Sequence, residues 1–232
     1  MDDLVEKALA KWPNVPSLAG WLKLTMQGDW LLTRPEQEGP HDDEPSEDGL
    51  AAGLPAGLPI THSRILNFIA RNYTCEPDGR YYFQNGPQKA YVTLDYTPWV
   101  YRLYPLEDGS LVLLSHTGLV LLPTAMWMDS DGKVLIQTQV GVGVLHSSDM
   151  EIFSTGLATV NDQAGAEHFV HETSWTVPEH PEKDLPAQRI GLRRLKTSSD
   201  SGTFGLKLGL SKIETARVPA YFAFVTNPEV KL

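Results

Sequence analysis

The sequence predicts a β-rich α+β protein built from a helix and successive antiparallel hairpins, and three observations carry that prediction. One amphipathic helical pattern near residue 65 is followed at once by short runs rich in aromatic and β-branched residues. The chain then continues to residue 225 as one strand-prone run after another. Acid–glycine turns recur at 78–79, 108–109 and 131–132, which is typical of hairpins because glycine accepts a positive φ.

The first predicted elements are a short helix and a strand pair. Asp2–Lys11 places its apolar residues on one side, and two prolines soon afterwards end the helix because proline has no amide donor. Leu18–Leu32 is expected to form two strands around a Gly28-Asp29 turn. Arg34–Pro59 combines acids with prolines and glycines, so we interpret it as an insertion with little to bury.

The helix near residue 65 is expected to begin at Thr61 or Ser63, either of which can cap the first free amides. Its apolar stripe recurs at three- and four-residue steps and consists of Ile65, Leu66, Ile69 and Tyr73. The strands that follow are expected near 81–83, 91–93, 99–104, 110–115, 119–122, 124–128, 133–140, 152–161, 167–177, 188–196, 203–210 and 221–225.

Composition restricts the class of partner. Of 232 residues, 41% are hydrophobic and 21% charged, as in ordinary globular proteins. The net charge is −10, but Arg34–Gly49 holds seven carboxylates and one arginine, which gives −6 and leaves −4 for the rest. No basic stripe favours nucleic acid. No apolar run approaches the ~20 residues that span a bilayer, and the acidic start is unlike a signal peptide. We therefore expect a cytoplasmic protein that binds neither nucleic acid nor membranes.

Two stretches resemble an uncharacterised bacterial family, domain-of-unknown-function family 1285 (DUF1285). They are LPITHSRILNFIARNYTCEPDGRYYF and YVTLDYTPWVYRL, followed by GSLVLLSHTG and a D-x-D-G hairpin before KVLIQTQVGVG, within roughly Gly20–Leu157. The insertion before the helix is longer than in that family, and the C-terminal third extends beyond the resemblance. The resemblance implies two related subdomains, the second barrel-like and similar to a pleckstrin-homology barrel. It also implies a ligand groove between the halves and a signalling role, without an established reaction.

Motifs for catalysis, metals and cofactors are weak. His168 and His171 would share a helix face, but their neighbours favour a strand, on which positions three apart face opposite sides. The run His146-Ser-Ser-Asp149 has no nucleophile elbow. Cys75 is the only cysteine, so no internal disulfide can form, and we expect it to be packed in the interior. We therefore predict no catalytic residue, no metal and no cofactor.

The segment from Asp95 to Trp99 is the best candidate for a ligand site, because an acid and two aromatics flank a proline. Nearby arginines would contact an anion. The candidate ligand-binding residues are Arg71, Asp95, Tyr96, Trp99, Arg102 and His146. The competing interpretation assigns Trp99 and Tyr101 to the core and Asp95 to a turn.

We expect three segments: an N-terminal helix arm at 1–17, an α+β subdomain at 18–94 with the acidic insertion at 34–59, and a β-rich subdomain at 95–232. The expected function is a non-catalytic module that binds an unknown small molecule or protein partner, with a signalling role. Two alternatives stay open: an enzyme with an acid–base site around Asp95 and His146, and a structural adaptor. The sequence does not determine the ligand, the role of the acidic loop or the oligomeric state.

Overall fold

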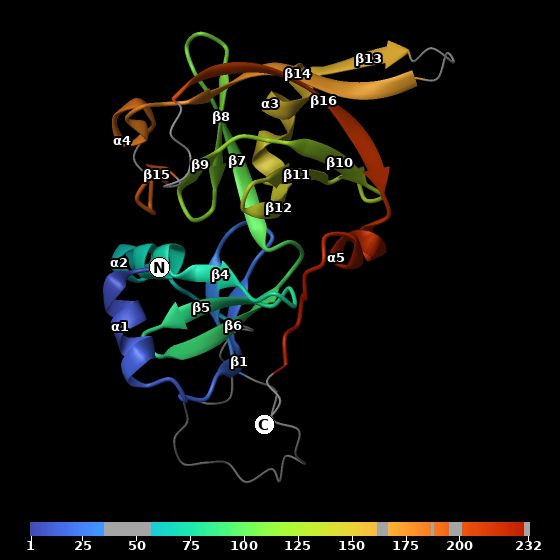
Figure 1. The fold of residues 1–232 in the computed structure, drawn as a ribbon. Helices are drawn as coiled ribbons and strands as arrows, with labels where there is room; N and C mark the ends of the chain where they lie inside the picture. The colour runs from blue at the N-terminus through green and yellow to red at the C-terminus, as the bar shows by residue number, and fades with distance from the viewer. Residues whose placement is uncertain (35–56, 162–166, 187, 195–200, 230–232) are drawn as a thin grey trace. The chain divides into compact units, whose positions relative to one another are not determined.

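The computed structural model describes residues 1–34, 57–161, 167–186, 188–194 and 201–229, so most of the acidic insertion lies outside the described residues. The chain divides into two compact units, which we describe one at a time (Figure 1). Unit 1 comprises residues 1–25, 29–95 and 225–232, and unit 2 comprises 26–28 and 96–224. The sequence did not suggest that the chain returns to unit 1 after residue 224.

Unit 1 holds two helices and a six-stranded sheet of order β3-β2-β1-β6-β5-β4. The β1–β6 pair is parallel, and the remaining pairs are antiparallel. The elements are α1 (Asp3–Lys11), β1 (Leu18–Leu24), β2 (Trp30–Leu32), β3 (Leu58–Pro59), α2 (Ser63–Arg71), β4 (Tyr73–Cys75), β5 (Tyr81–Asn85) and β6 (Gln88–Leu94).

The core of unit 1 lies between α2 and one face of this sheet. Leu66, Ile69 and Ala70 of the helix are buried, and Phe68 packs edge-on against Phe83 of β5 with ring centroids 5.4 Å apart. The sheet contributes alternate residues, as a half-covered strand must. Leu24 of β1 stands opposite Trp30 of β2 and beside Leu94 of β6, and all three are buried.

Several local predictions for unit 1 are wrong. Neither Thr61 nor Ser63 caps α2, because the N-cap residue is His62 and no side chain caps it. Ile65 is 50% exposed rather than buried. Leu58–Pro59, expected in the insertion, pairs with β2 as strand β3. Cys75, expected in the interior, is exposed, and its thiol donates to the carbonyl of Glu76 at 3.0 Å.

In its described residues, unit 2 is mostly β-structure with five short helical segments. Its strands are β7 (Trp99–Pro105), β8 (Leu111–Ser115), β9 (Leu119–Leu121), β10 (Ala125–Asp129), β11 (Val134–Thr138), β12 (Gly141–Leu145), β13 (Leu157–Asn161), β14 (Glu167–Val177), β15 (Arg193–Arg194) and β16 (Gly202–Ile213). The helical segments are Ser147–Asp149 with α3 (Met150–Thr155), α4 (Pro181–Asp184), and Thr215–Arg217 with α5 (Val218–Tyr221).

Seven of these strands close into a barrel. The pairing order is β14-β16-β10-β11-β12-β7-β8, and β8 pairs back to β14 at Leu111 and Trp175. The antiparallel hairpins expected at the Asp-Gly turns are present as β7–β8 and β10–β11. Parallel pairs β7–β12 and β10–β16 join them, which the sequence did not indicate. The β-rich α+β class with a barrel-like second part is confirmed.

The barrel interior is built from large apolar side chains, including Trp175, Tyr101 and Phe153, all of which are almost fully buried. Two strand predictions in unit 2 are wrong. Residues 152–155 belong to helix α3, and residues 218–221, which include the start of an expected strand, form helix α5. In the described residues of 188–196, only Arg193–Arg194 forms a strand.

Candidate functional site

Unit 1 carries a pocket of about 620 Å³ beside helix α2, which we call the apolar groove. It is lined by residues from β1, β2, β3, β5 and β6, from the segment between β3 and α2, and from α2 itself. The lining residues are Leu18, Trp21, Leu22, Leu32, Pro59, Ile60, Thr61, His62, Ile65, Ile69, Phe83, Asn85 and Ala90. A concave site with apolar walls and few polar groups is typical of small-molecule binding.

Strand register explains why apolar side chains meet in this groove. Leu22 of β1 stands opposite Leu32 of β2, and Ala90 of β6 stands opposite Phe83 of β5 and beside Leu18 of β1. Residues paired across neighbouring strands share one face of a sheet. Leu22 is buried while Leu32 is 52% exposed, so this face passes from covered core to open groove.

On the helix side of the groove, the side chains likewise change from buried to exposed. Ile65 and Ile69 are one helical turn apart and therefore lie on one side of α2. Ile69 is buried, whereas Ile65 is half exposed. Trp21 on β1, another lining residue, is 44% exposed. A group of large apolar side chains exposed side by side is typical of a binding surface, whereas single exposed apolar side chains are common on any protein.

The polar groups of the groove are few and uncharged or basic. They are Thr61 and His62 before the helix and Asn85 at the end of β5. Among the lining residues that the structure describes there is no aspartate or glutamate. The groove therefore offers apolar contact along its length and hydrogen bonds at a small number of points.

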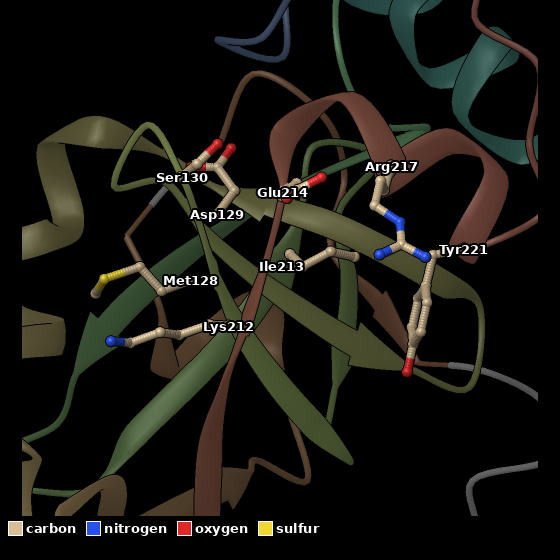
Figure 2. A pocket seen from close by; sticks show the side chains of 8 residues that line it. All are labelled: Met128, Asp129, Ser130, Lys212, Ile213, Glu214, Arg217 and Tyr221. Carbon is tan, nitrogen blue, oxygen red and sulfur yellow. The ribbon is translucent and has the colours of Figure 1, made fainter.

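Unit 2 has a second pocket, of about 580 Å³, near the ends of strands β10 and β16. Figure 2 shows its lining residues: Met128, Asp129, Ser130, Lys212, Ile213, Glu214, Arg217 and Tyr221. The side chains of Lys212 and Arg217 extend to opposite sides of the β16 ribbon (Figure 2). The two cations therefore do not converge on one point, as binding of a single anionic group would require.

The one buried acid of this second pocket already has its partners. Asp129 accepts hydrogen bonds from the Tyr96 hydroxyl at 2.5 Å and from the amides of Asp131 and Lys133 at 2.9 and 2.8 Å. Burial and the neighbouring carboxylate raise the pKa of Tyr96 above its ordinary value. These bonds fix the Asp-x-Asp-Gly turn, so we assign Asp129 a structural role.

A half-buried ion pair involves Arg102, one of the predicted ligand contacts, and the buried carboxylate of Asp149. Asp149 accepts from Arg102 Nε at 2.7 Å, from Nη2 at 3.1 Å and from the Leu103 amide at 2.9 Å. This bidentate contact raises the pKa of Arg102. The Arg102 guanidinium is thus engaged by Asp149 although its side chain is 38% exposed, and Asp149 joins the turn before α3 to strand β7.

The two predicted ligand residues of unit 1 each form an ion pair. Arg71, at the end of α2, binds the Asp2 carboxylate through Nε at 3.0 Å. Asp95, after β6, binds Lys23 Nζ at 2.6 Å. Neither residue lines the apolar groove. Arg71 ties the start of the chain to α2, and the bond to Asp95 links β1 to the end of β6.

The remaining predicted residues belong to unit 2. Tyr96 and Trp99 are buried, and Trp99 lies on β7 beside Gly143 of β12. The His146 amide donates to the Tyr101 carbonyl at 2.9 Å, and its Nδ1 accepts from the Ser148 amide at 3.2 Å. The six candidates therefore divide between the two units, and their action as one binding site remains a prediction.

Sequence reasoning missed the groove residues. The alternation of Leu18, Leu22 and Leu24 indicates a core-facing side of a strand, but a strand pattern does not tell where a covering helix ends. Ile65 fits the buried stripe of α2 equally well by spacing. The exposed positions of Leu32 and Ile65 become visible only when helix and sheet are placed together.

The described residues also bear on two other kinds of site. No group of three or more His, Cys, Asp or Glu side chains in that part of the chain is arranged to hold a metal ion. None of the helices there has the length and apolar character needed to cross a membrane.

Comparison with known families gives one match along nearly the whole sequence. The family model described as "Protein of unknown function (DUF2946)" matches residues 1–229. The chain therefore belongs to the DUF2946 family. None of the curated proteins matches it.

Two solved structures, both of DUF1285 family proteins, are similar to this chain. The protein from Shewanella baltica OS155 has 15% identity and a TM-score of 0.38, covering 59% of this chain and 91% of its own. The protein from Silicibacter pomeroyi DSS-3 has 14% identity and a TM-score of 0.42, covering 70% and 87%. The resemblance predicted from the sequence is confirmed. At these TM-scores neither similarity says anything about function.

Proposed function

We propose that this member of the DUF2946 family is a non-catalytic binding module, and that the apolar groove of unit 1 holds its ligand. The single observation that carries the proposal is the joint exposure of Trp21, Leu32 and Ile65 around a pocket of about 620 Å³. Leaving such side chains in water costs about 25 cal/mol per Å² of apolar surface, which a ligand recovers on binding. The ligand class is a small molecule with an apolar body.

The alternative of an acid–base enzyme receives less support. Asp95 and His146 belong to different units, and neither lines either of the two pockets described above. Asp95 is held by Lys23 in an ion pair. A cytoplasmic location and a role in signalling remain part of the proposal, in which the ligand acts by stabilising the conformation that it binds more tightly.

The test uses the neutral, apolar fluorescent probe N-phenyl-1-naphthylamine. Wild-type protein is expected to increase the probe's emission in a saturable way with a stoichiometry of one. Ile65→Asp places a carboxylate on the groove wall at a position already half exposed, so folding is retained. Because a charge disfavours an apolar ligand, this variant is expected to weaken probe binding by at least about tenfold.

Leu4→Asp is the matched control. Leu4 is 79% exposed on α1 and does not line the groove, so the same chemical change there is expected to leave probe binding as in the wild type. Circular dichroism verifies that both variants are folded. Absence of saturable binding to the wild type, or equal weakening by both substitutions, would show that the groove is not the site.

A further inference from the structure

We infer that the ligand of the apolar groove is a single-chain amphiphile with an anionic head group, such as a medium- or long-chain carboxylate. The inference rests on the proposed function of the groove and adds the chemistry and orientation of the ligand. The hydrocarbon chain lies along the strands and α2, and the head lies where the groove meets Thr61 and His62. The anionic head is placed there because its charge is complementary to the start of α2.

The segment at the α2 end of the groove contains basic residues and no acidic ones. The chain carries a net charge of −10, yet residues 57–75 contain no aspartate or glutamate. They do contain His62, Arg64 and Arg71. Arg71 is engaged by Asp2 at the far end of the helix. Arg64, in the first helical turn next to the groove residues His62 and Ile65, is exposed. Arg64 is not a lining residue, but it is adjacent in sequence to this end of the groove, and the lining residues include no carboxylate that would repel an anionic head.

The first turn of α2 strengthens this preference. The N-cap residue His62 makes no side-chain cap, and no acid occupies the first turn. The helix accepts its first backbone bond at the His62 carbonyl, from Leu66 at 3.1 Å. The backbone N–H groups of the first turn, which precede Leu66, therefore have no acceptor within the helix. These amides and the helix dipole favour an anion. Such a helix end would not make a site by itself, but here it borders the apolar groove.

The rest of the groove suits a hydrocarbon chain better than a second polar group. Away from the helix start, its polar lining residue is Asn85, and its other walls include Leu18, Leu22, Phe83 and Ala90. A ligand with charges at both ends would place one of them against these apolar side chains, which is unfavourable. One anionic end and one apolar end fit both halves of the groove.

The test compares two ligands of equal chain length, decanoate and 1-decanol, by displacement of N-phenyl-1-naphthylamine from the full-length wild-type protein below the micellar concentration. Decanoate is expected to bind about five- to tenfold more tightly than decanol. Added salt is expected to reduce this difference, because the extra attraction is between charges near the surface.

Charge-reversal variants locate the head group. Arg64→Glu is expected to remove the preference for decanoate over decanol, and an acid in the first turn is compatible with a stable helix. Lys7→Glu makes the same charge change on the exposed side of α1 and is expected to keep the preference. Decanol binding gives the reference for both variants.

The outcomes separate this inference from the function on which it rests. If probe and decanol bind but decanoate binds no better, or if Lys7→Glu and Arg64→Glu act alike, the anionic head is wrong and the apolar-ligand function stands. If neither the probe nor either ligand binds, the proposed function itself fails. Binding that weakens as protein concentration rises would show a second copy in the groove and overturn the inference.

Discussion

At the scale of single residues, Asp149 is a buried acid whose hydrogen bonds join two elements of unit 2. Its side chain is 4% exposed and accepts three hydrogen bonds, two from Arg102 and one from the backbone of β7. Loss of the buried carboxylate would leave the buried Leu103 amide without its acceptor and the Arg102 guanidinium, whose side chain is 38% exposed, only partly solvated. Asp149 therefore holds the turn before α3 to the barrel wall.

Asp149→Ala is expected to lower the free energy of unfolding by about 3 kcal/mol, because it leaves the Arg102 guanidinium and the Leu103 amide without their acceptor. Chemical denaturation measures the change. Glu151→Ala, at an exposed position of α3, is the control and is expected to change stability by less than about 0.5 kcal/mol. A loss below about 1 kcal/mol for Asp149→Ala would contradict the structural role.

Two interior histidines predict how stability depends on pH. His171 stacks on Phe153 with ring centroids 4.5 Å apart and bonds the Phe153 carbonyl through Nε2 at 3.1 Å. Burial lowers its pKa. Burial and the nearby Arg193 lower the pKa of His116 to about 3. Both folded-state values lie below the ordinary value near 6.5, so both side chains are neutral in the folded protein at neutral pH.

The direction in which stability changes with pH follows from the difference in proton binding between the folded and unfolded states. Above about pH 6.5 both histidines are neutral in the folded and in the unfolded state, so they do not lower the free energy of unfolding. Below it the unfolded chain binds protons that the folded chain refuses, so stability falls toward pH 5 by up to about 1.4 kcal/mol per pH unit for each histidine. Replacing His171 with Phe is expected to make this slope shallower, whereas His180→Gln, at an exposed position, is expected to preserve it. Equal stability at pH 7 and pH 5 would refute the prediction.

At the scale of elements, the contact between β7 and β12 depends on one glycine. A Cβ at Gly143 would lie 2.5 Å from the Tyr101 ring and 2.8 Å from the Trp99 Cβ. The Tyr101 hydroxyl donates to the Gly141 carbonyl at 2.8 Å and is 2.9 Å from Thr138 Oγ1, so the ring cannot move freely. Gly143 thus permits the close approach that closes this side of the barrel.

Gly143→Ala is expected to cost about 2 kcal/mol, as overpacked cores do. Gly209→Ala on β16 is the matched control, because nothing lies within 4 Å of its added Cβ. It is expected to be neutral or slightly stabilising, since glycine in a strand loses more backbone entropy on folding. The two melting temperatures give the comparison, and a Gly143→Ala protein as stable as the wild type would count against this packing.

The elements also show what sequence can predict. The helices of unit 1 and the hairpins at the Asp-Gly turns follow from local spacing and turn chemistry. Strand β3 and helices α3 and α5 do not, because tertiary pairing decides short segments of mixed propensity. For the same reason Ile65 is expected in the core but lies half exposed at the groove. Local patterns define which face of an element is apolar, and only packing defines how much of that face is covered.

At the scale of the whole molecule, the chain closes both units through contacts that are distant in sequence. The barrel closes where β8 meets β14, and the end of the chain completes unit 1. There the Val225 amide donates to the Gly79 carbonyl at 3.0 Å, and the Leu94 amide donates to the Thr226 carbonyl at 2.8 Å. Such long-range pairing leaves no local signal, so the sequence did not indicate the return of the chain.

Truncation of the chain after Phe224 is expected to remove the Thr226 carbonyl that accepts from the Leu94 amide, and so to weaken the end of β6. Hydrogen–deuterium exchange should then be faster in peptides covering 91–95, by at least about tenfold, because the amide loses its acceptor. Peptides from β11, in the other unit, serve as the internal control and should exchange as in the full-length chain. Unchanged exchange at 91–95 would show that the C-terminal contacts do not stabilise unit 1.

Amide chemical-shift mapping of the full-length protein titrated with decanoate tests directly whether the apolar groove of unit 1 binds the ligand. The groove account predicts saturable shifts at Leu22, Leu32, Ile65 and Phe83, with further shifts in the first turn of α2. Peaks from the pocket of unit 2, such as Met128 and Arg217, should not move. Shifts confined to unit 2 would contradict the assignment of the apolar groove as the ligand site, as would the absence of shifts with both decanoate and 1-decanol.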